Sequence, residues 1–241
     1  MAVLNGAKLT WFGHSTFLLE TAAGTRIMLD PWLTGNPATP AELADPGDID
    51  IIAVSHGHSD HTGDVIRLAA EKKPQAVVAM VELAGYFAAQ GVENTVGMNK
   101  GGSNEIAGIG VTLTNAHHSS SVDGENGLPQ YVGEPTGMVL TLENGFRIYF
   151  AGDTTVFGDM ALIGELYKPD LAMLPIGDFY TMGPLEAAKA VELLGVKHVL
   201  GMHYGTFPIL VGTPSALRDE LANRGVEGVE VEELAPGETL T

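Results

Sequence analysis

The stretch VSHGHSDHTGD, from Val54 to Asp64, decides how the rest of the chain is interpreted. It places three histidines and two aspartates in eleven residues, although the whole chain of 241 residues has only eight histidines. The preceding run DIIAVS (50–55) predicts a buried strand, and TGDVIRLAAEKK (62–73) predicts a helix that stops before Pro74. The histidines therefore gather where a strand ends and the chain turns toward a helix.

The spacing inside this stretch indicates two metal ions. His56 and His58 are two positions apart, so in extended backbone their side chains point to the same side, as two ligands of one ion would. Asp60 and His61 follow as the chain turns, and because adjacent residues point apart they can address a second ion. Asp60 alone would also suit a helix N-terminus, where a carboxylate stabilises free N–H groups. That alternative does not explain three histidines, so we interpret the stretch as a metal site.

Three further candidate ligands each follow a predicted apolar strand. His118 follows GVTLTNA, Asp153 follows FRIYFAG and His203 follows HVLGM. Any one of them alone would more often be a surface turn residue, but three together with the histidine cluster supply the ligands that a two-metal site needs. His117 precedes His118 directly and takes its role if the strand ends one residue earlier.

Composition limits the possible partners and the kind of site. The chain has no cysteine, so a metal must be held by histidine and carboxylate. With 12 Lys and Arg against 30 Asp and Glu, the net charge of −18 would repel a nucleic-acid polymer. The sequence shows neither an apolar run of membrane-spanning length nor a secretory signal pattern. We therefore expect a cytoplasmic protein without membrane contact.

Strand and helix patterns alternate without a linker, which predicts a single domain over residues 1–241. The segments 8–31 and 136–154 have the pattern of antiparallel hairpins, the latter around Asn144-Gly145. Helices are predicted over 81–91, 183–195 and 213–225, alternating with short apolar strands. Hairpins early in each half, followed by this alternation, predict two mixed sheets face to face with helices outside.

The motifs as a set resemble the metallo-β-lactamase superfamily of metal-dependent hydrolases. HGHSDH (56–61), with Asp30, His118, Asp153 and His203 in this order, is similar to the five-motif pattern of that superfamily. WFGHSTF, HSSS, AGDT, PIGDFYTMGP and MHYGTFP resemble, within it, a group related to the L-ascorbate 6-phosphate lactonases. The resemblance implies an α/β fold, the αββα four-layer sandwich, with its site at one edge between the sheets.

The resemblance also implies a role for each matching residue. The expected cofactors are two divalent ions, with zinc preferred and manganese, iron or nickel as alternatives for the same donors. Asp30 is expected to support the site rather than to bind metal. The remaining residues divide into His56, His58 and His118 for the first ion, Asp60, His61 and His203 for the second, and Asp153 bridging both.

Several other polar residues are candidates for supporting roles. His14, in WFGHS, is interpreted either as a proton shuttle or substrate contact, or as a buried histidine hydrogen-bonded within the first hairpin. Asp178 and Tyr180 follow a predicted strand and are candidates for substrate contacts, with ordinary turn residues as the alternative. His198 lies at the opposite end of its strand from His203 and is expected to be structural.

These residues predict a hydrolase that acts on a small ester, lactone or phosphorylated substrate. The attacking group would be a metal-bridging hydroxide, and Asp60 would guide the proton to the leaving group. One alternative is a phosphodiesterase acting on a small phosphodiester, and another is a non-catalytic metal-binding protein on the same scaffold. The expected partner is a small molecule, and relatives lead us to expect a homo-oligomer.

Overall fold

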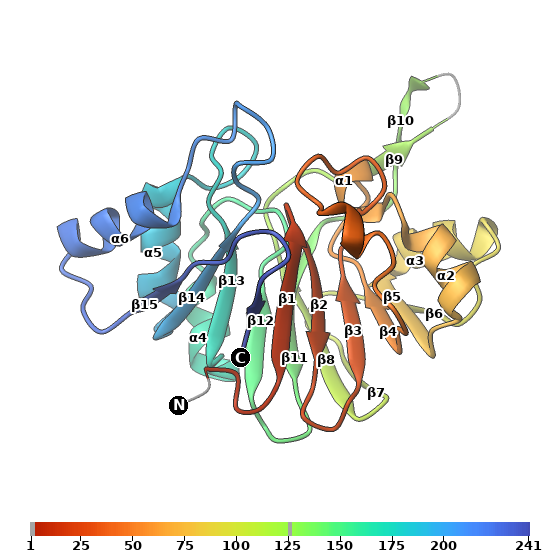
Figure 1. Cartoon of the computed structure of the whole chain (residues 1–241), viewed down its shortest axis with the longest axis horizontal. Helices are drawn as coiled ribbons and strands as arrows, with labels where there is room; N and C mark the ends of the chain where they lie inside the picture. The colour runs from red at the N-terminus through yellow and green to blue at the C-terminus, as the bar shows by residue number, and fades with distance from the viewer. Residues whose placement is uncertain (1–2, 125–126) are drawn as a thin grey trace.

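Two seven-stranded mixed sheets face each other in the computed structural model, which describes residues 3–124 and 127–241 (Figure 1). Each sheet has antiparallel pairing at one side and parallel pairing at the other. The first sheet has the order β16 (Thr239–Leu240), β1 (Lys8–Gly13), β2 (Thr16–Glu20), β3 (Arg26–Leu29), β4 (Ile51–Ala53), β5 (Ala76–Met80), β6 (Thr95–Met98).

The second sheet repeats this arrangement with the later part of the chain. A separate two-stranded ribbon projects from one end of the sandwich and consists of β9 (Ser121–Asp123) and β10 (Pro129–Tyr131) (Figure 1). The sheet itself has the order β15 (Glu230–Glu232), β14 (His198–Met202), β13 (Leu171–Pro175), β12 (Arg147–Phe150), β11 (Thr136–Thr141), β8 (Ile109–Asn115), β7 (Ser103–Ile106).

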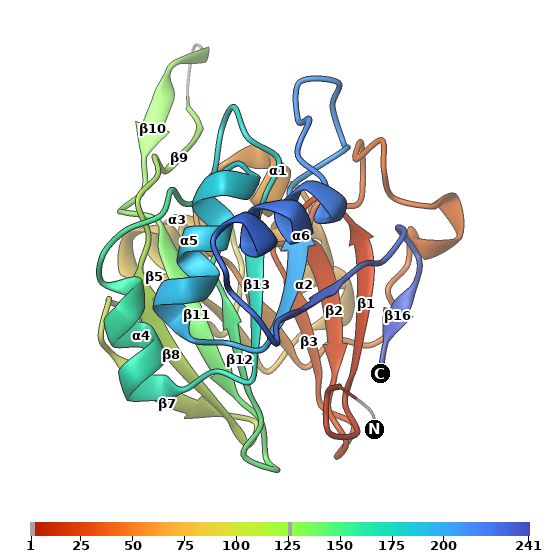
Figure 2. The same ribbon diagram turned by 90° about the vertical axis from the view of Figure 1, so that its left-hand side faces the viewer.

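Helices cover the outer faces of the two sheets (Figure 2). Two of them pack on the first sheet and three on the second, while the shortest helix lies at the end where the strands stop. Within the described residues, no helix has both the length and the apolar character needed to cross a bilayer. The helices are α1 (Ser59–Thr62), α2 (Val65–Lys72), α3 (Val81–Ala89), α4 (Met160–Tyr167), α5 (Pro184–Leu194) and α6 (Pro214–Asn223), with a 3-10 turn, η1, at Ala41–Leu43.

Strand β3 shows how the sheet separates two cores. Ile27 and Leu29 point into the cluster between the sheets, whereas Met28 points outward into the cluster beneath α2 and α3. This alternation follows from the two-residue period of a strand. All three side chains are fully buried, because this central strand is covered by the facing sheet on one side and by helices on the other.

The αββα sandwich confirms the fold predicted from the sequence, and the hairpin predicted over 136–154 is present as β11 and β12. The segment 8–31 differs from the predicted hairpin, because its first arm turns at His14 and Ser15 and forms two paired strands, β1 and β2, before β3.

Helix α4 was not predicted, and the helix predicted from Thr62 begins only at Val65, because Gly63 and Asp64 separate α2 from the short helix α1 that ends at Thr62. The Asp64 carboxylate accepts hydrogen bonds from the N–H groups of Leu33 and Thr34, which ties this break to the loop after β3. The break lets α1 lie across the strand ends while α2 packs on the sheet.

Candidate metal centre

Three histidines from two segments form the first group of potential metal ligands. His56 and His58 follow β4, and His118 follows β8 of the opposite sheet. One ring nitrogen from each lies within 4.8 Å of the others, and His56 Nε2 is 3.0 Å from His58 Nδ1. His117 instead stacks on Phe157, with 4.8 Å between ring centroids. The structure therefore brings His118, and not His117, to the cluster.

A second group lies beside the first and contains one carboxylate. Asp60 and His61 are on α1, while His203 follows β14 of the other sheet. Asp60 Oδ2 is 3.8 Å from Nε2 of His61 and 3.8 Å from Nε2 of His203. His14, between β1 and β2, completes a set of four residues with potential donor atoms within 4.8 Å of one another.

Asp153 lies between the two groups. It follows β12, and its buried Oδ2 is 3.0 Å from Nε2 of His203 and 3.3 Å from Nε2 of His61. The same oxygen is 3.6 Å from Nε2 of His118 and 3.9 Å from Nε2 of His56. One carboxylate oxygen thus reaches two histidines of each group, as a ligand shared by two ions would.

Asp30 supports the cluster from beneath. Its carboxylate is fully buried after β3, and its Oδ2 is 2.7 Å from His61 Nδ1. Ser55 donates to both oxygens, from its N–H to Oδ1 at 2.7 Å and from its hydroxyl to Oδ2. An acceptor at His61 Nδ1 fixes that imidazole with Nε2 directed toward Asp153 and Asp60.

His14 is completely buried and holds Asp60 in place. Its Nε2 is 3.0 Å from Asp60 Oδ2, and its Nδ1 is 2.9 Å from the hydroxyl oxygen of Thr206. A neutral ring would donate from Nε2 to the carboxylate and accept from Thr206 at Nδ1. These bonds leave the first hairpin and connect it to the loop after β14.

Burial and neighbouring charges divide the histidines into two electrostatic classes. Burial lowers the pKa of His56, His58 and His118, so these imidazoles are neutral at pH 7. Burial also lowers the pKa of His14 to about 4, although its bond to Asp60 opposes this shift. Neutral imidazole is the form that binds a metal ion.

His61 and the two site carboxylates behave differently. Burial alone would lower the pKa of His61, but the carboxylates of Asp153, Asp60 and Asp30 outweigh it and raise that pKa well above its ordinary value. Burial alone would raise the pKa of both Asp153 and Asp60. The neighbouring His203 and His61 nevertheless hold the pKa of Asp153 low. In the same way, His61 and His14 hold the pKa of Asp60 low. The metal-free centre therefore contains ionised carboxylates around a protonated His61.

Unsatisfied buried atoms test whether these residues fit a metal. Among the described residues, five buried side-chain atoms make no hydrogen bond, and three of them belong to site residues: His61 Nε2, Asp153 Oδ1 and His203 Nδ1. Leaving a buried polar atom unpaired costs about 1–3 kcal/mol, so such atoms need an explanation. Of these three, His61 Nε2 faces the cluster, 3.3 Å from Asp153 Oδ2, and the set of imidazole and carboxylate donors suits a divalent ion.

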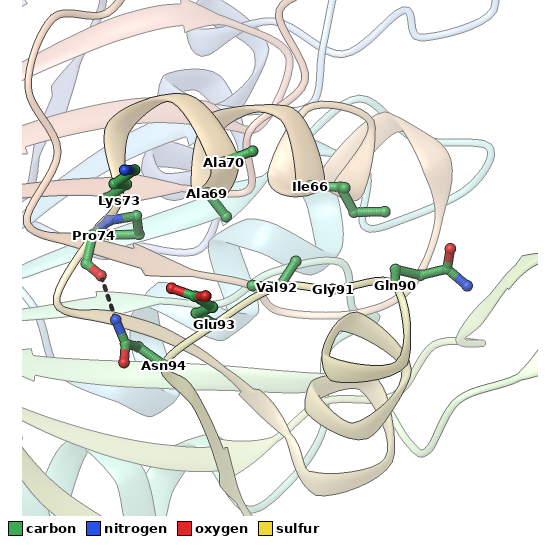
Figure 3. A pocket seen from close by; sticks show the side chains of 10 residues that line it. All are labelled: Ile66, Ala69, Ala70, Lys73, Pro74, Gln90, Gly91, Val92, Glu93 and Asn94. Atoms are coloured by element: carbon green, nitrogen blue, oxygen red, sulfur yellow. Dashed lines mark hydrogen bonds between the residues drawn. The ribbon is translucent and has the colours of Figure 1, made fainter.

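A cavity of about 500 Å³ opens onto this centre. Its lining combines histidines and carboxylates of both groups with the aromatic side chains of Trp32, Tyr180 and Phe207. A different hollow of about 300 Å³ lies between α2 and the end of α3 (Figure 3). It contains no histidine, and its charged side chains are Lys73 and Glu93. The chemistry is therefore concentrated at the first cavity.

Comparison with known proteins identifies the family. A profile described as "Beta-lactamase superfamily domain" matches residues 25–204. The chain belongs to the β-lactamase superfamily. A "UPF0173 metal-dependent hydrolase" of Rubrobacter xylanophilus is 51% identical over 99% of this chain and 98% of the relative, so the chain also belongs to that group of the superfamily. A relative with the same description from Herpetosiphon aurantiacus is 49% identical over 97% of both chains.

Solved structures agree with this assignment. Igni18, described as a metallo hydrolase from Ignicoccus hospitalis, is similar with a TM-score of 0.84 and 34% identity, covering 97% of both chains. The metallo-β-lactamase fold protein YhfI from Bacillus subtilis, at 17% identity and a TM-score of 0.69, shares the fold. The resemblance seen in the sequence and the sandwich predicted from it are both confirmed.

In this member of the β-lactamase superfamily, the other residues predicted to have supporting roles do not all lie at the metal centre. Tyr180 lines the cavity, whereas Asp178 is exposed and accepts a hydrogen bond from the Phe179 N–H within its own loop. His198 is at the far end of β14 and bonds Glu232. The cavity residues absent from the predicted site include two aromatic side chains, Trp32 and Phe207. Trp32 comes two residues after Asp30, and Phe207 comes four residues after His203. Their closeness to site residues in the sequence could have marked them as candidates for the cavity lining.

Gly177 sets the position of the His203 loop and provides a stability test. A Cβ at Gly177 would overlap the carbonyl oxygen of His203. Gly177→Ala is expected to lower the free energy of unfolding by about 3 kcal/mol, because the backbone cannot yield without moving His203. Thermal unfolding measures this loss, and Gly158→Ala is the control because its Cβ would meet no atom within 4 Å. Equal stabilities of the two variants would contradict the packing described.

Proposed function

We propose that this chain hydrolyses a small ester or lactone with two divalent metal ions. His56, His58 and His118 would hold one ion, and Asp60, His61 and His203 the other, with Asp153 shared between them. The observation that carries the proposal is the single Asp153 oxygen, which lies 3.0 to 3.9 Å from histidine nitrogens of both groups. Membership among relatives described as metal-dependent hydrolases supports it.

The donor set favours zinc, with manganese, iron and nickel as alternatives. The chain has no cysteine, and every proposed ligand is an imidazole or a carboxylate. Divalent ions held there would supply a water whose pKa falls from about 15.7 toward 7, together with positive charge for a developing oxyanion.

Asp60 is the residue best placed to move a proton during the reaction. Its side chain is 30% exposed and lines the cavity, whereas those of Asp30 and Asp153 are buried. The low pKa of Asp60 keeps it ionised, so it would orient the attacking water by accepting its hydrogen bond and would hold the proton only transiently. The hydrogen bond from His14, itself fixed by Thr206, orients the carboxylate toward the cavity, and the proton then passes to the leaving alkoxide.

Metal analysis and a substrate panel test the proposal together. Protein purified without added metal is analysed by mass spectrometry for metal content. It is then assayed with p-nitrophenyl esters, lactones and bis-p-nitrophenyl phosphate, before and after chelation. We expect about two ions per chain and turnover of esters or lactones that chelation removes and divalent metal restores. Absence of bound metal after reconstitution would overturn the proposal.

The two metal groups should respond differently to pH. In the metal-free protein the raised pKa of His61 keeps it protonated at pH 7, so binding at its group must displace a proton. The pKa values of His56, His58 and His118 are lowered, so these three hold no competing proton. Affinity of the His61 group should therefore rise by about tenfold per pH unit while that proton remains, and affinity of the other group should change little.

Calorimetric titration of the metal-free protein with Zn²⁺ at about pH 6 and pH 8 measures this difference. We expect two classes of binding, of which only one weakens at the lower pH and releases a proton. Two classes with the same pH dependence would contradict the assignment of the proton to His61.

A further inference from the structure

The cavity over the metal centre has aromatic outer walls. The rings of Trp32 and Phe207 lie together, with 6.1 Å between their centroids and 32° between their planes. His14 contacts both edge-on, at centroid distances of 5.3 Å and 6.0 Å, so this wall is fixed to the metal centre. Phe207 also follows Thr206, whose hydroxyl bonds His14.

Tyr180 faces the same cavity from the loop after β13. That loop holds two consecutive non-glycine residues at positive φ, Asp178 at 67° and Phe179 at 59°. Such conformations are unfavourable for side chains of this size and accumulate at functional sites. Phe179 packs edge-on against the Tyr180 ring at 4.7 Å. The strained turn thus presents an aromatic ring at the mouth of the cavity.

These rings are exposed although they are large and apolar. Tyr180 is 57% exposed and Phe207 39% exposed. Exposed apolar surface gathered around a concave site indicates that a ligand covers it. Aromatic faces prefer an aromatic or other flat apolar group, which can stack on them.

In the part of the chain that the structure describes, the cavity lining offers no side-chain cation to an anionic group that lies away from the metal centre. Among the described residues, none of the twelve Lys and Arg side chains lines the cavity, and its carboxylates are Asp60 and Asp153. Several basic side chains form ion pairs elsewhere, for example Arg67 with Asp64 and Lys100 with Glu134. A carboxylate or phosphate remote from the reacting bond would meet no side-chain cation in a chain of net charge −18.

We infer that the substrate is an uncharged ester or lactone bearing an aryl group, which binds between Tyr180 and the Trp32–Phe207 wall. This inference rests on the proposed function and specifies its substrate class. In the reaction, one water is consumed, the acyl C–O bond breaks, a C–OH bond forms, and the proton goes to the leaving alkoxide. A phosphorylated substrate, which the sequence left open, fits these walls poorly because they offer it no cation.

Three methyl esters with the same leaving group test the inference on the metal-loaded enzyme. Methyl phenylacetate carries an aryl group, methyl acetate is the small member, and monomethyl succinate is the anionic member. A parallel set of lactones consists of γ-phenyl-γ-butyrolactone, γ-butyrolactone and γ-butyrolactone-γ-carboxylate. We expect kcat/KM for the aryl member to exceed that of the small member by about 10- to 100-fold, and the anionic member to be the poorest.

Substitutions of the aromatic residues that line the cavity test whether they cause the preference for the aryl ester. Phe207→Ala should lower the ratio of aryl to small-ester kcat/KM by about tenfold. Tyr180→Lys should raise kcat/KM for monomethyl succinate, because it supplies the missing cation. Leu166→Ala is the matched control, since this residue is 65% exposed on α4 and does not line the cavity, and it should leave every ratio unchanged.

Two failures can be told apart. Chelator-sensitive turnover with no aryl preference, or with preference for the anionic member, would overturn the inference and leave the proposed function standing. No chelator-sensitive turnover of any ester or lactone would overturn the proposed function and the inference with it.

Discussion

An Asp153→Asn variant is expected to lose metal-dependent hydrolysis by about a thousandfold or more and to remain folded. The carboxylate oxygen that it replaces lies within 3.9 Å of four histidine nitrogens from both groups. A neutral amide supplies neither the negative charge that two divalent ions need between them nor two acceptor oxygens. The measurement is kcat/KM with saturating Zn²⁺, combined with metal content and a circular dichroism spectrum.

The control for this variant is Asp159→Asn. Asp159 is an exposed aspartate just before α4 in the same segment of the chain, and it does not line the cavity. It should retain full activity and two ions. Wild-type turnover in Asp153→Asn at the same metal content would show that this carboxylate is not shared by the ions.

An Asp30→Asn variant should bind the ion at His61 about 10- to 100-fold more weakly, although Asp30 touches no proposed metal position. The Ser55 N–H donates to Asp30 Oδ1, so the amide must keep its oxygen there. Its NH₂ group then replaces Oδ2, 2.7 Å from His61 Nδ1. An N–H donor at this place requires Nδ1 to accept, so the ring keeps its single proton on Nε2, which blocks the nitrogen that faces Asp153.

Zinc titration with a competing chelator measures this loss, and ring-nitrogen NMR of the metal-free variant reports the tautomer. Asp178→Asn is the control, because Asp178 is exposed and its carboxylate bonds only within its own loop among the contacts described. Unchanged affinity of both ions in Asp30→Asn would contradict the role given to this carboxylate.

The proposed ligands could be predicted from the sequence because strand ends are recognisable without tertiary information. The apolar runs before His56, His118, Asp153 and His203 are all strands in the structure, and each residue follows its strand closely. In a layered α/β fold such strand ends meet at one edge, so residues far apart in the sequence converge there. The ambiguity between His117 and His118 needed the structure, since a change of one residue reverses the side of a strand.

Contacts between loops could not be predicted in the same way. The bond between His14 and Thr206 joins residues 192 positions apart, and no periodic pattern encodes it. The wall formed by Trp32 and Phe207 likewise depends on how two loops pack. Strand β7 was missed because its sequence SNEI is mostly exposed and lacks apolar alternation, so only pairing with β8 makes it a strand.

Anomalous X-ray diffraction from crystals of the Zn²⁺-loaded protein, recorded at the zinc absorption edge, would show directly whether two ions bind at this cluster. We expect two strong peaks in the anomalous difference map. One should lie among His56, His58 and His118 and the other among Asp60, His61 and His203, with Asp153 contacting both. A map without peaks in this cluster, or with zinc bound only elsewhere on the chain, would contradict the proposed two-metal centre.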